Sequence, residues 1–211
     1  DLDLQWWKGR GAGRFDTARY LFTVRQAEAV TVWDFDEDGH LDVLGGGDGG
    51  GDPVLYFGDG HGLFARSTAL TSGPSGPPSA SLVVDLDGDR HPDLVWALRD
   101  QPLLGVALNR GRGTFAPASF VPVADAGAIL VVAADFDGAP GLDLLAENAN
   151  SSLNLLLNRG NATFAPLLSL ENFHVTPHPT SIAVADFNAD HRPDIALFED
   201  GELHLHLDAC P

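Results

Sequence analysis

The stretch DFDEDGHLD, from Asp34 to Asp42, places four aspartates an even number of positions apart. Carboxylates crowded in this way repel one another, so the stretch requires a positive partner. Calcium takes six to eight oxygen ligands and tolerates irregular geometry better than magnesium does. The residue types and their spacing therefore predict a calcium-binding loop.

The stretch recurs at intervals of about 50 residues, as DLDGDRHPD from Asp85, DFDGAPGLD from Asp135 and DFNADHRPD from Asp186. These four stretches, called here the first to fourth acidic loops, contain half of the 30 acidic residues, so the net charge of −18 is largely local. Since 44% of the residues are hydrophobic, the composition indicates a folded tandem array rather than a disordered acidic chain.

Short apolar runs flank every acidic loop. In the second repeat, ASLVVDL leads into the loop and PDLVWAL leads out of it. A second repeated element, GVALNRGRGTFAP at 105–117, returns as LNLLLNRGNATFAP at 153–166. Short β-rich runs separated by Gly, Asn and Pro predict strands, and no segment has a sustained period of 3.6. We expect all-β units of four antiparallel strands. The acidic loop joins the first strand to the second, and the glycine-rich turn joins the third to the fourth.

The phrase VADFNADHRPDIALF, together with LNRGRGTFAP at this period, resembles the FG-GAP or VCBS repeats of integrin α-subunit β-propellers and related extracellular proteins. The resemblance implies that each repeat is one propeller blade whose acidic loop binds calcium. It divides the chain into a half blade at 1–25, blades at 26–75, 76–126 and 127–175, and a partial blade at 176–211. Because third-strand residues occur in both the first and the last unit, we expect part of a larger propeller rather than a closed ring.

The family resemblance assigns metal ligands to positions one, three, five and nine of each loop, with the carbonyl of position seven as a further donor in the first two. The expected ligands are Asp34, Asp36, Asp38, His40 and Asp42; Asp85, Asp87, Asp89, His91 and Asp93; and Asp186, Asn188, Asp190 and Asp194. The third loop keeps Asp135, Asp137 and Asp143 but has Ala139 at position five. We expect three full calcium sites and a fourth that is weak or empty. The alternative is a set of acidic turns held by their own hydrogen bonds.

An EF-hand is the competing calcium motif, because it also begins D-x-D-x-D-G. It requires an acidic residue at position twelve and helices on both sides. Position twelve is Gly45, Trp96, Ala146 or Leu197, and the flanks predict strands. These residues disfavour the EF-hand. Position six, where glycine is usual, is a glycine only in the first of the three full loops, so the backbone path of the others is not fixed by the sequence.

Several features predict an extracellular or cell-surface location. Calcium loops of this kind suit the millimolar calcium outside cells, and sequons at Asn150 and Asn161 predict glycosylation. The single cysteine, Cys210, either pairs with another chain or a missing propeller segment or is a free thiol. The sequence contains no apolar run long enough for membrane insertion, and its acidic charge disfavours nucleic acid.

The sequence contains no G-x-S-x-G, H-E-x-x-H or phosphate-loop motif, and metal binding accounts for the carboxylate spacing, so a non-catalytic protein is predicted. We expect a calcium-binding module for protein–protein interaction or adhesion, with a protein or glycan ligand. Its ligand face is expected on the loops opposite the acidic loops, with Asp48, Asp52, His174 and His178. The alternatives are a propeller lectin, with pockets between blades lined by aromatic and polar residues, and the propeller of a polysaccharide-degrading enzyme.

Overall fold

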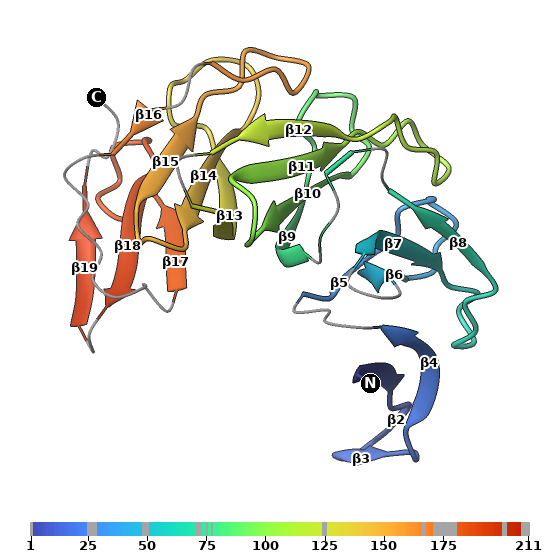
Figure 1. The fold of residues 1–211 in the computed structure, drawn as a ribbon. Helices are drawn as coiled ribbons and strands as arrows, with labels where there is room; N and C mark the ends of the chain where they lie inside the picture. The colour runs from blue at the N-terminus through green and yellow to red at the C-terminus, as the bar shows by residue number, and fades with distance from the viewer. Residues whose placement is uncertain are drawn as a thin grey trace.

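The computed structural model describes residues 2–24, 29–47, 51–70, 73–74, 76, 78–123, 126–165, 168–170, 181–199 and 202–207. These residues form β-strands joined by turns, and none of them is helical. The strands make a series of antiparallel sheets that follow one another around an arc, from the blue N-terminal part to the red C-terminal part (Figure 1). The predicted all-β propeller architecture is confirmed.

The first sheet corresponds to the second half of a blade. Strand β1 (Leu2–Trp6) pairs antiparallel with β4 (Arg19–Val24), and between them β2 (Gly9–Gly11) and β3 (Arg14–Phe15) form a small hairpin. This is the predicted order of a third strand, a glycine-rich turn and a fourth strand.

The following sheets are four-stranded, except the last, which has three described strands. Blade 1 contains β5 (Thr31–Trp33), β6 (Asp42–Gly47), β7 (Gly51–Phe57) and β8 (Arg66–Ala69). Blade 2 contains β9 (Pro78–Val84), β10 (Asp93–Leu98), β11 (Leu103–Ala107) and β12 (Ser119–Pro122). Blade 3 contains β13 (Ala128–Ala134), β14 (Asp143–Asn148), β15 (Leu153–Leu156) and β16 (Leu168–Ser169). Blade 4 contains β17 (Ser181–Ala185), β18 (Asp194–Glu199) and β19 (Glu202–His206).

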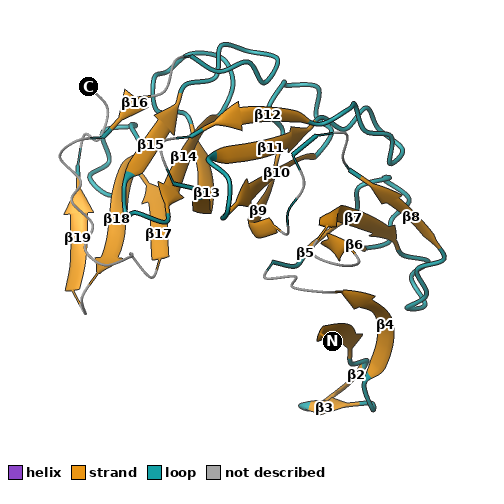
Figure 2. Cartoon of the chain, viewed as in Figure 1, coloured by secondary structure: helices purple, strands orange, loops and turns teal. Residues whose placement is uncertain are grey.

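Within each blade the strands lie in chain order, so each blade is a meander of consecutive strands (Figure 2). The first strands of neighbouring blades are in contact: β5 with β9, β9 with β13 and β13 with β17. These first strands lie on the inner side of the arc, and the fourth strands lie farther out (Figure 1). The acidic loops, which follow the first strands, are therefore brought next to one another along the array.

Hydrophobic cores lie between blades. One core joins Phe35 and Leu55 of blade 1 to Leu94 and Trp96 of blade 2. A second core joins blade 2 to blade 3, and a third joins blade 3 to blade 4. Strand β10 shows how one strand serves two cores: Leu94 and Trp96 face blade 1, whereas the alternating Val95 faces blade 3. Leu94 to Leu98 of β10 are all buried for this reason, which explains the apolar run that follows Asp93.

Candidate metal centres

Each acidic loop joins the first strand of its blade to the second, as predicted, and turns through left-handed residues. Position four has φ values of 60° at Glu37, 80° at Gly88, 72° at Gly138 and 63° at Ala189. Position six has φ values of 89° at Gly39, 74° at Arg90 and 69° at His191. The first, second and fourth loops therefore follow the same path without needing glycine at position six. The third loop differs, because Pro140 holds φ near −65° and Gly141 takes a φ of 109° instead.

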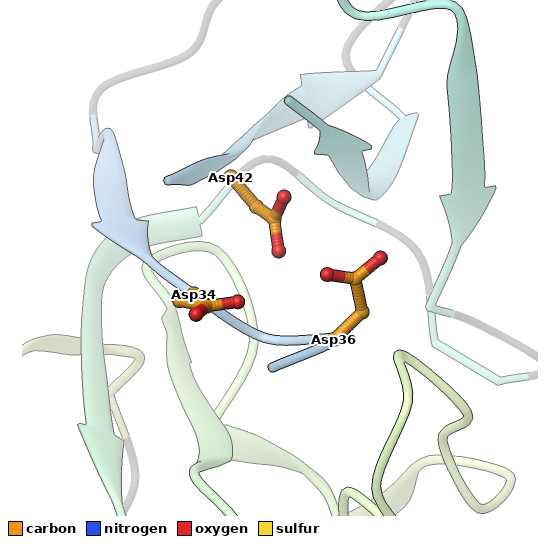
Figure 3. A group of neighbouring side chains, drawn as sticks. All are labelled: Asp34, Asp36 and Asp42. Carbon is orange, nitrogen blue, oxygen red and sulfur yellow. The ribbon is translucent and has the colours of Figure 1, made fainter. Parts of the chain in front are cut away.

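In the first three loops, the carboxylates of positions one, three and nine converge. One oxygen of each lies within 4.8 Å of the others in three groups, namely Asp34, Asp36 and Asp42; Asp85, Asp87 and Asp93; and Asp135, Asp137 and Asp143. Figure 3 shows the first group, with its carboxylates turned toward one another. Three carboxylates in this arrangement offer only oxygen ligands to a shared cation, which is the donor type that calcium prefers.

The position-one carboxylate is fixed by the N–H groups of its own loop. In the first loop, positions five and six donate to Asp34 Oδ1 and Oδ2 at 3.1 and 2.9 Å. In the second, positions four and six donate to Asp85 Oδ1 and Oδ2 at 2.8 and 3.0 Å. In the fourth, positions five and six donate to Asp186 Oδ1 and Oδ2 at 3.1 and 2.8 Å. The chain is therefore wrapped around this side chain and orients it.

Position nine carries an aspartate that is fully buried in all four loops. Its Oδ2 accepts the N–H of position two at 2.8 or 2.9 Å. In the first three loops its Oδ1 accepts an N–H from the glycine-rich turn of the same blade, from Gly58 at 2.9 Å, Asn109 at 2.8 Å and Asn158 at 2.7 Å. The loop and the turn therefore lie on the same face of the blade, as predicted. Each carboxylate oxygen has further lone pairs, so these bonds are compatible with a metal ligand.

Burial raises the pKa of the position-nine carboxyl in the first three loops above its ordinary value, and that of Asp93 rises to about 6. The backbone N–H donors oppose this effect, and the other carboxylates of the loop add to it. The group thus carries an electrostatic cost that a cation among the three carboxylates would relieve.

The first group contains a buried carboxylate oxygen without a partner. The Asp36 side chain is 10% exposed, and its Oδ1 has no hydrogen-bond partner within the described part of the chain. Its Oδ2 accepts a hydrogen bond from the Arg66 guanidinium, which lies 3.5 Å from the centre of the Phe57 ring. A buried anionic oxygen with no partner is unfavourable, so this group fits a cation. Arg66 is particular to blade 1, since blades 2 and 3 have Pro117 and Pro166 at this place.

Position five, a predicted ligand, belongs to none of the three groups. Its Oδ1 instead accepts the N–H of position seven at 2.8 Å, in Asp38 as in Asp89. These bonds close local turns of the type that aspartate favours. The third loop, which has Ala139 at this position, therefore assembles the same three carboxylates as the other two. Its Asp135 and Asp137 are exposed, whereas their counterparts in the first two loops are partly buried. Weaker binding at the third loop stays a prediction.

The fourth loop is arranged differently. Asn188 stands at position three, where it accepts the N–H of Asp190 through Oδ1 at 2.9 Å and donates to Asp190 Oδ2 at 3.1 Å. Although all nine residues are described, they form no three-carboxylate group. Phe187 at position two is 48% exposed, whereas its counterpart Phe35 is fully buried.

Two asparagines that the sequence reasoning missed connect neighbouring blades at these loops. Asn109, in the turn of blade 2, donates from Nδ2 to the Phe35 carbonyl of the first loop at 2.8 Å. Asn158, in the turn of blade 3, donates to the Leu86 carbonyl of the second loop at 2.8 Å. Both asparagines are buried. The repeated Asn-Arg-Gly of the turns was the signal that could have identified them.

The other predicted residues are only partly described. Asp52 lies in β7 and is partly exposed, whereas the predictions for Asp48, His174, His178 and Cys210 lie outside the described residues. Asn150 and Asn161 are both exposed in turns of blade 3, so their side chains are accessible. Glycosylation at these two residues stays a prediction, as does metal binding by the carbonyls of His40 and His91.

The sheets are meander blades arranged along an arc, with cores between the blades and an acidic loop after each first strand. These features define a β-propeller with acidic-loop repeats. The model of the FG-GAP-like repeat family matches residues 34–96, 85–138 and 141–197, which is more than half of the chain. The chain therefore belongs to the FG-GAP-like repeat family. No curated protein showed significant similarity to it.

Solved structures that align with the chain include a lectin from Agrocybe aegerita described as specifically recognising non-reducing terminal N-acetylglucosamine. It aligns with a TM-score of 0.65 and 17% identity, over 97% of this chain and 57% of the lectin. The Tc holotoxin pore of Photorhabdus luminescens aligns with a TM-score of 0.45 and 20% identity, over 97% of this chain and 10% of that one. BBS1N, solved in complex with ARL6DN, aligns with a TM-score of 0.47 and 14% identity, over 84% of this chain and 55% of that one. The chain thus spans less than two thirds of each of these structures.

Proposed function

We propose that this chain is a calcium-stabilised β-propeller module that binds a protein or glycan partner outside the cell. The observation that carries the proposal is the first three-carboxylate group, with its buried and unpartnered Asp36 oxygen. Oxygen-only ligands in an irregular loop suit calcium, and sites of this type are matched to extracellular calcium concentrations. We propose ions at the first, second and fourth loops, with weak or no binding at the third.

The role proposed for the loops is structural. Phe35, at position two of the first loop, is buried in the core between blades 1 and 2, and its carbonyl accepts the hydrogen bond from Asn109. Leu86 has the same role between blades 2 and 3. A bound calcium ion would supply the positive charge that offsets the repulsion between carboxylates. Holding the loop in shape then holds the junction between two blades.

Partner binding is proposed from the architecture, because a rigid propeller presents loops from several blades on one surface. A protein partner and an adhesive role come first, and a glycan is the second candidate, supported by the fold shared with a lectin and by the pocket described below. The propeller of a polysaccharide-degrading enzyme ranks third, since the loop contacts account for the clustered carboxylates. No helix in the described chain is long and apolar enough to cross a membrane.

Thermal unfolding of metal-free protein, with calcium, magnesium or chelator added, tests the metal proposal. We expect calcium to raise the melting temperature, because each site adds about 2.7 kcal/mol to the free energy of unfolding where the ion is a hundredfold above its dissociation constant. Asp36→Asn should weaken the effect, whereas Asp100→Asn, in the exposed turn after β10, should leave it intact. A melting temperature that is the same in calcium and in chelator, with metal removal verified, contradicts the proposal.

A further inference from the structure

A pocket of about 730 Å³ lies at the junction of blades 1 and 2. The end of β5 and the first acidic loop form one side, and the end of β9 and the second acidic loop form the other. The volume is in the range of pockets that hold small organic ligands. Asp34 and Asp85 at its edge are position-one carboxylates of the two proposed metal sites, so the other side chains of the lining are the ones available to a ligand.

The blade 1 side of the pocket offers an exposed aromatic surface. Trp33, the last residue of β5, is 50% exposed, and Leu41 beside it is 62% exposed. Val83, Val84 and Pro92 supply apolar surface on the blade 2 side. Large apolar side chains left open to water in a concave site mark a surface that gains free energy when a ligand covers it.

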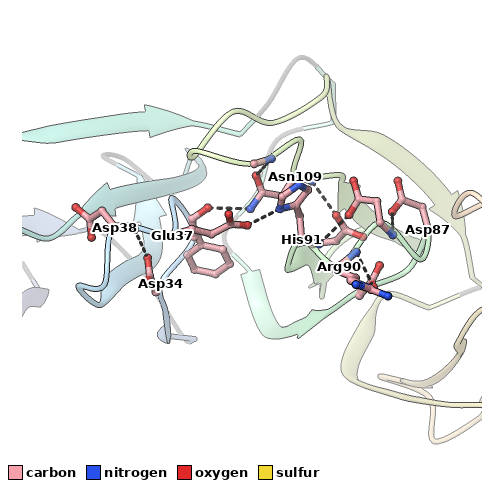
Figure 4. A network of polar contacts seen from close by, with 12 residues as sticks. Asp34, Glu37, Asp38, Asp87, Arg90, His91 and Asn109 are labelled. Atoms are coloured by element: carbon pink, nitrogen blue, oxygen red, sulfur yellow. Dashed lines mark hydrogen bonds and ion pairs between the residues drawn. The ribbon is translucent and has the colours of Figure 1, made fainter.

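Polar groups stand at the rim of the same pocket. Glu37 of the first loop pairs through Oε1 with His91 Nδ1 of the second loop, across the junction (Figure 4). The His91 ring lies against Gly111, where a Cβ would approach within 2.9 Å of it. The side chains of Glu37 and His91 are 45% and 32% exposed, and Arg90 lines the same pocket, so polar atoms of these residues are open to water. The rim thus offers hydrogen-bond donors and a carboxylate acceptor within one pocket.

An apolar surface beside hydrogen-bonding groups matches a sugar ring. A pyranose has an apolar face of C–H groups that packs on an indole, and hydroxyls around its edge that both donate and accept hydrogen bonds. The rim pairs a glutamate with a histidine and an arginine, so neither sign of charge dominates among the groups that are available. We propose that this pocket binds one neutral pyranose residue of a glycan, with its apolar face on Trp33 and its hydroxyls toward Glu37, Arg90 and His91.

The proposal predicts a single site in the described chain. The residue that precedes position one is Trp33 in blade 1 but Val84, Ala134 and Ala185 in the following blades. Position four is Glu37 in the first loop and Gly88, Gly138 or Ala189 in the others. The junctions that follow therefore lack both the aromatic surface and the acidic acceptor.

This site depends on the proposed function, because the two loops that form it are the ones proposed to bind calcium. The test uses calcium-loaded full chain on a glycan array that contains neutral and sialylated oligosaccharides, followed by titration calorimetry with chitotriose, maltotriose and lactose. We expect binding of a neutral glycan at one site per chain. Trp33→Ala should weaken binding at least tenfold, Trp33→Phe should retain part of it, and Trp7→Ala, which removes an equally exposed tryptophan that does not line the pocket, should have no effect.

Circular dichroism melts of the same variants show whether each one is folded and calcium-stabilised. The pocket proposal is supported if neutral glycans bind, and if Trp33→Ala abolishes this binding while its melting curve is preserved. The pocket proposal is overturned if no glycan binds or if only sialylated glycans bind. It is also overturned if more than one site per chain is found, or if Trp33→Ala leaves the affinity unchanged. If calcium stabilises the protein and no glycan binds, only the pocket proposal fails. If a neutral glycan binds through Trp33 without any calcium effect, only the metal proposal fails.

Discussion

Asn109 and Phe35 lie in different blades, and the Asn109 side-chain amide donates a hydrogen bond to the Phe35 carbonyl oxygen at 2.8 Å. The side chain of Phe35 is buried in the core between the same two blades. The residues on either side of Phe35, Asp34 and Asp36, are members of the three-carboxylate group. Packing between blades and the geometry of the metal centre therefore meet in three consecutive residues of the first acidic loop.

Replacing this asparagine should destabilise the junction. Asn109→Ala leaves the Phe35 carbonyl without its donor, so we expect the free energy of unfolding to fall by about 1–3 kcal/mol. In the structure, Asn109 Oδ1 also accepts the Gly111 N–H at 3.0 Å. Asn109→Asp keeps this acceptor but loses the donor to the Phe35 carbonyl, so it should also lower the free energy of unfolding. Urea unfolding in calcium measures both. Asn150→Ala, at an exposed turn, is the control, and equal losses from Asn109→Ala and Asn150→Ala would contradict the role of the hydrogen bond.

The second and third loops should differ in calcium affinity. Asp87→Asn should remove one tightly bound calcium ion per chain. Asp87 is partly buried, and the position-six N–H of its loop holds the position-one carboxylate in place. Asp137→Asn should change the number of tight sites little, because Asp137 is exposed and Pro140 has no N–H to hold the position-one carboxylate. Calorimetric titration of metal-free protein counts the sites. Loss of one tight equivalent in both variants would show that the third loop binds as well as the second.

Arg66 should weaken calcium binding at the first loop. Its side chain is 54% exposed and its guanidinium pairs with Asp36, so it competes with a cation for the same carboxylate. We expect Arg66→Gln to tighten the first site about two- to fivefold, in line with a partly exposed ion pair. Arg14→Gln makes the same change of net charge in the first sheet and should leave the affinity unchanged. Titration with terbium, read by luminescence, measures both, and an equal or weaker affinity in Arg66→Gln argues against the competition.

Stability without calcium should fall as the pH rises. Burial raises the pKa of Asp93 from 3.8 to about 6, so its protonated form is favoured in the folded state. The resulting stabilisation is full below pH 3.8 and is lost as the pH rises through about 6, with a total of about 3 kcal/mol. The hydrogen bond that His91 Nδ1 donates to Glu37 raises the pKa of His91, and the loss of this proton acts in the same direction at higher pH.

Calcium should reverse this dependence, because only the carboxylate form binds the ion. Urea unfolding of metal-stripped protein between pH 4.5 and 7.5, repeated with calcium, measures the two slopes. The control is Asp93→Asn, which is neutral at every pH and should therefore show a flatter slope without calcium. A metal-free protein that gains stability over this range, or a slope that Asp93→Asn does not change, would rule out this carboxyl as the cause.

Local spacing was enough to predict the strands, the position of the acidic loops and the shared face of loops and turns, because all three repeat with the same period. The bond between Asn109 and Phe35 was not predictable, since it depends on how one blade is rotated against the next. Position five shows a second limit. The spacing of Asp38 suits both a metal ligand and a turn that binds the N–H of position seven, and only the structure shows that the turn bond is made.

The placement of the hydrophobic cores between blades has a consequence for synthesis of the chain. Phe35 and Leu55 of blade 1 are covered by Leu94 and Trp96, which follow about one repeat later. A nascent chain that has released only one blade from the ribosome exposes an entire apolar face until the next repeat emerges. Folding during translation must therefore lag synthesis by one repeat, and a single excised blade would aggregate rather than fold.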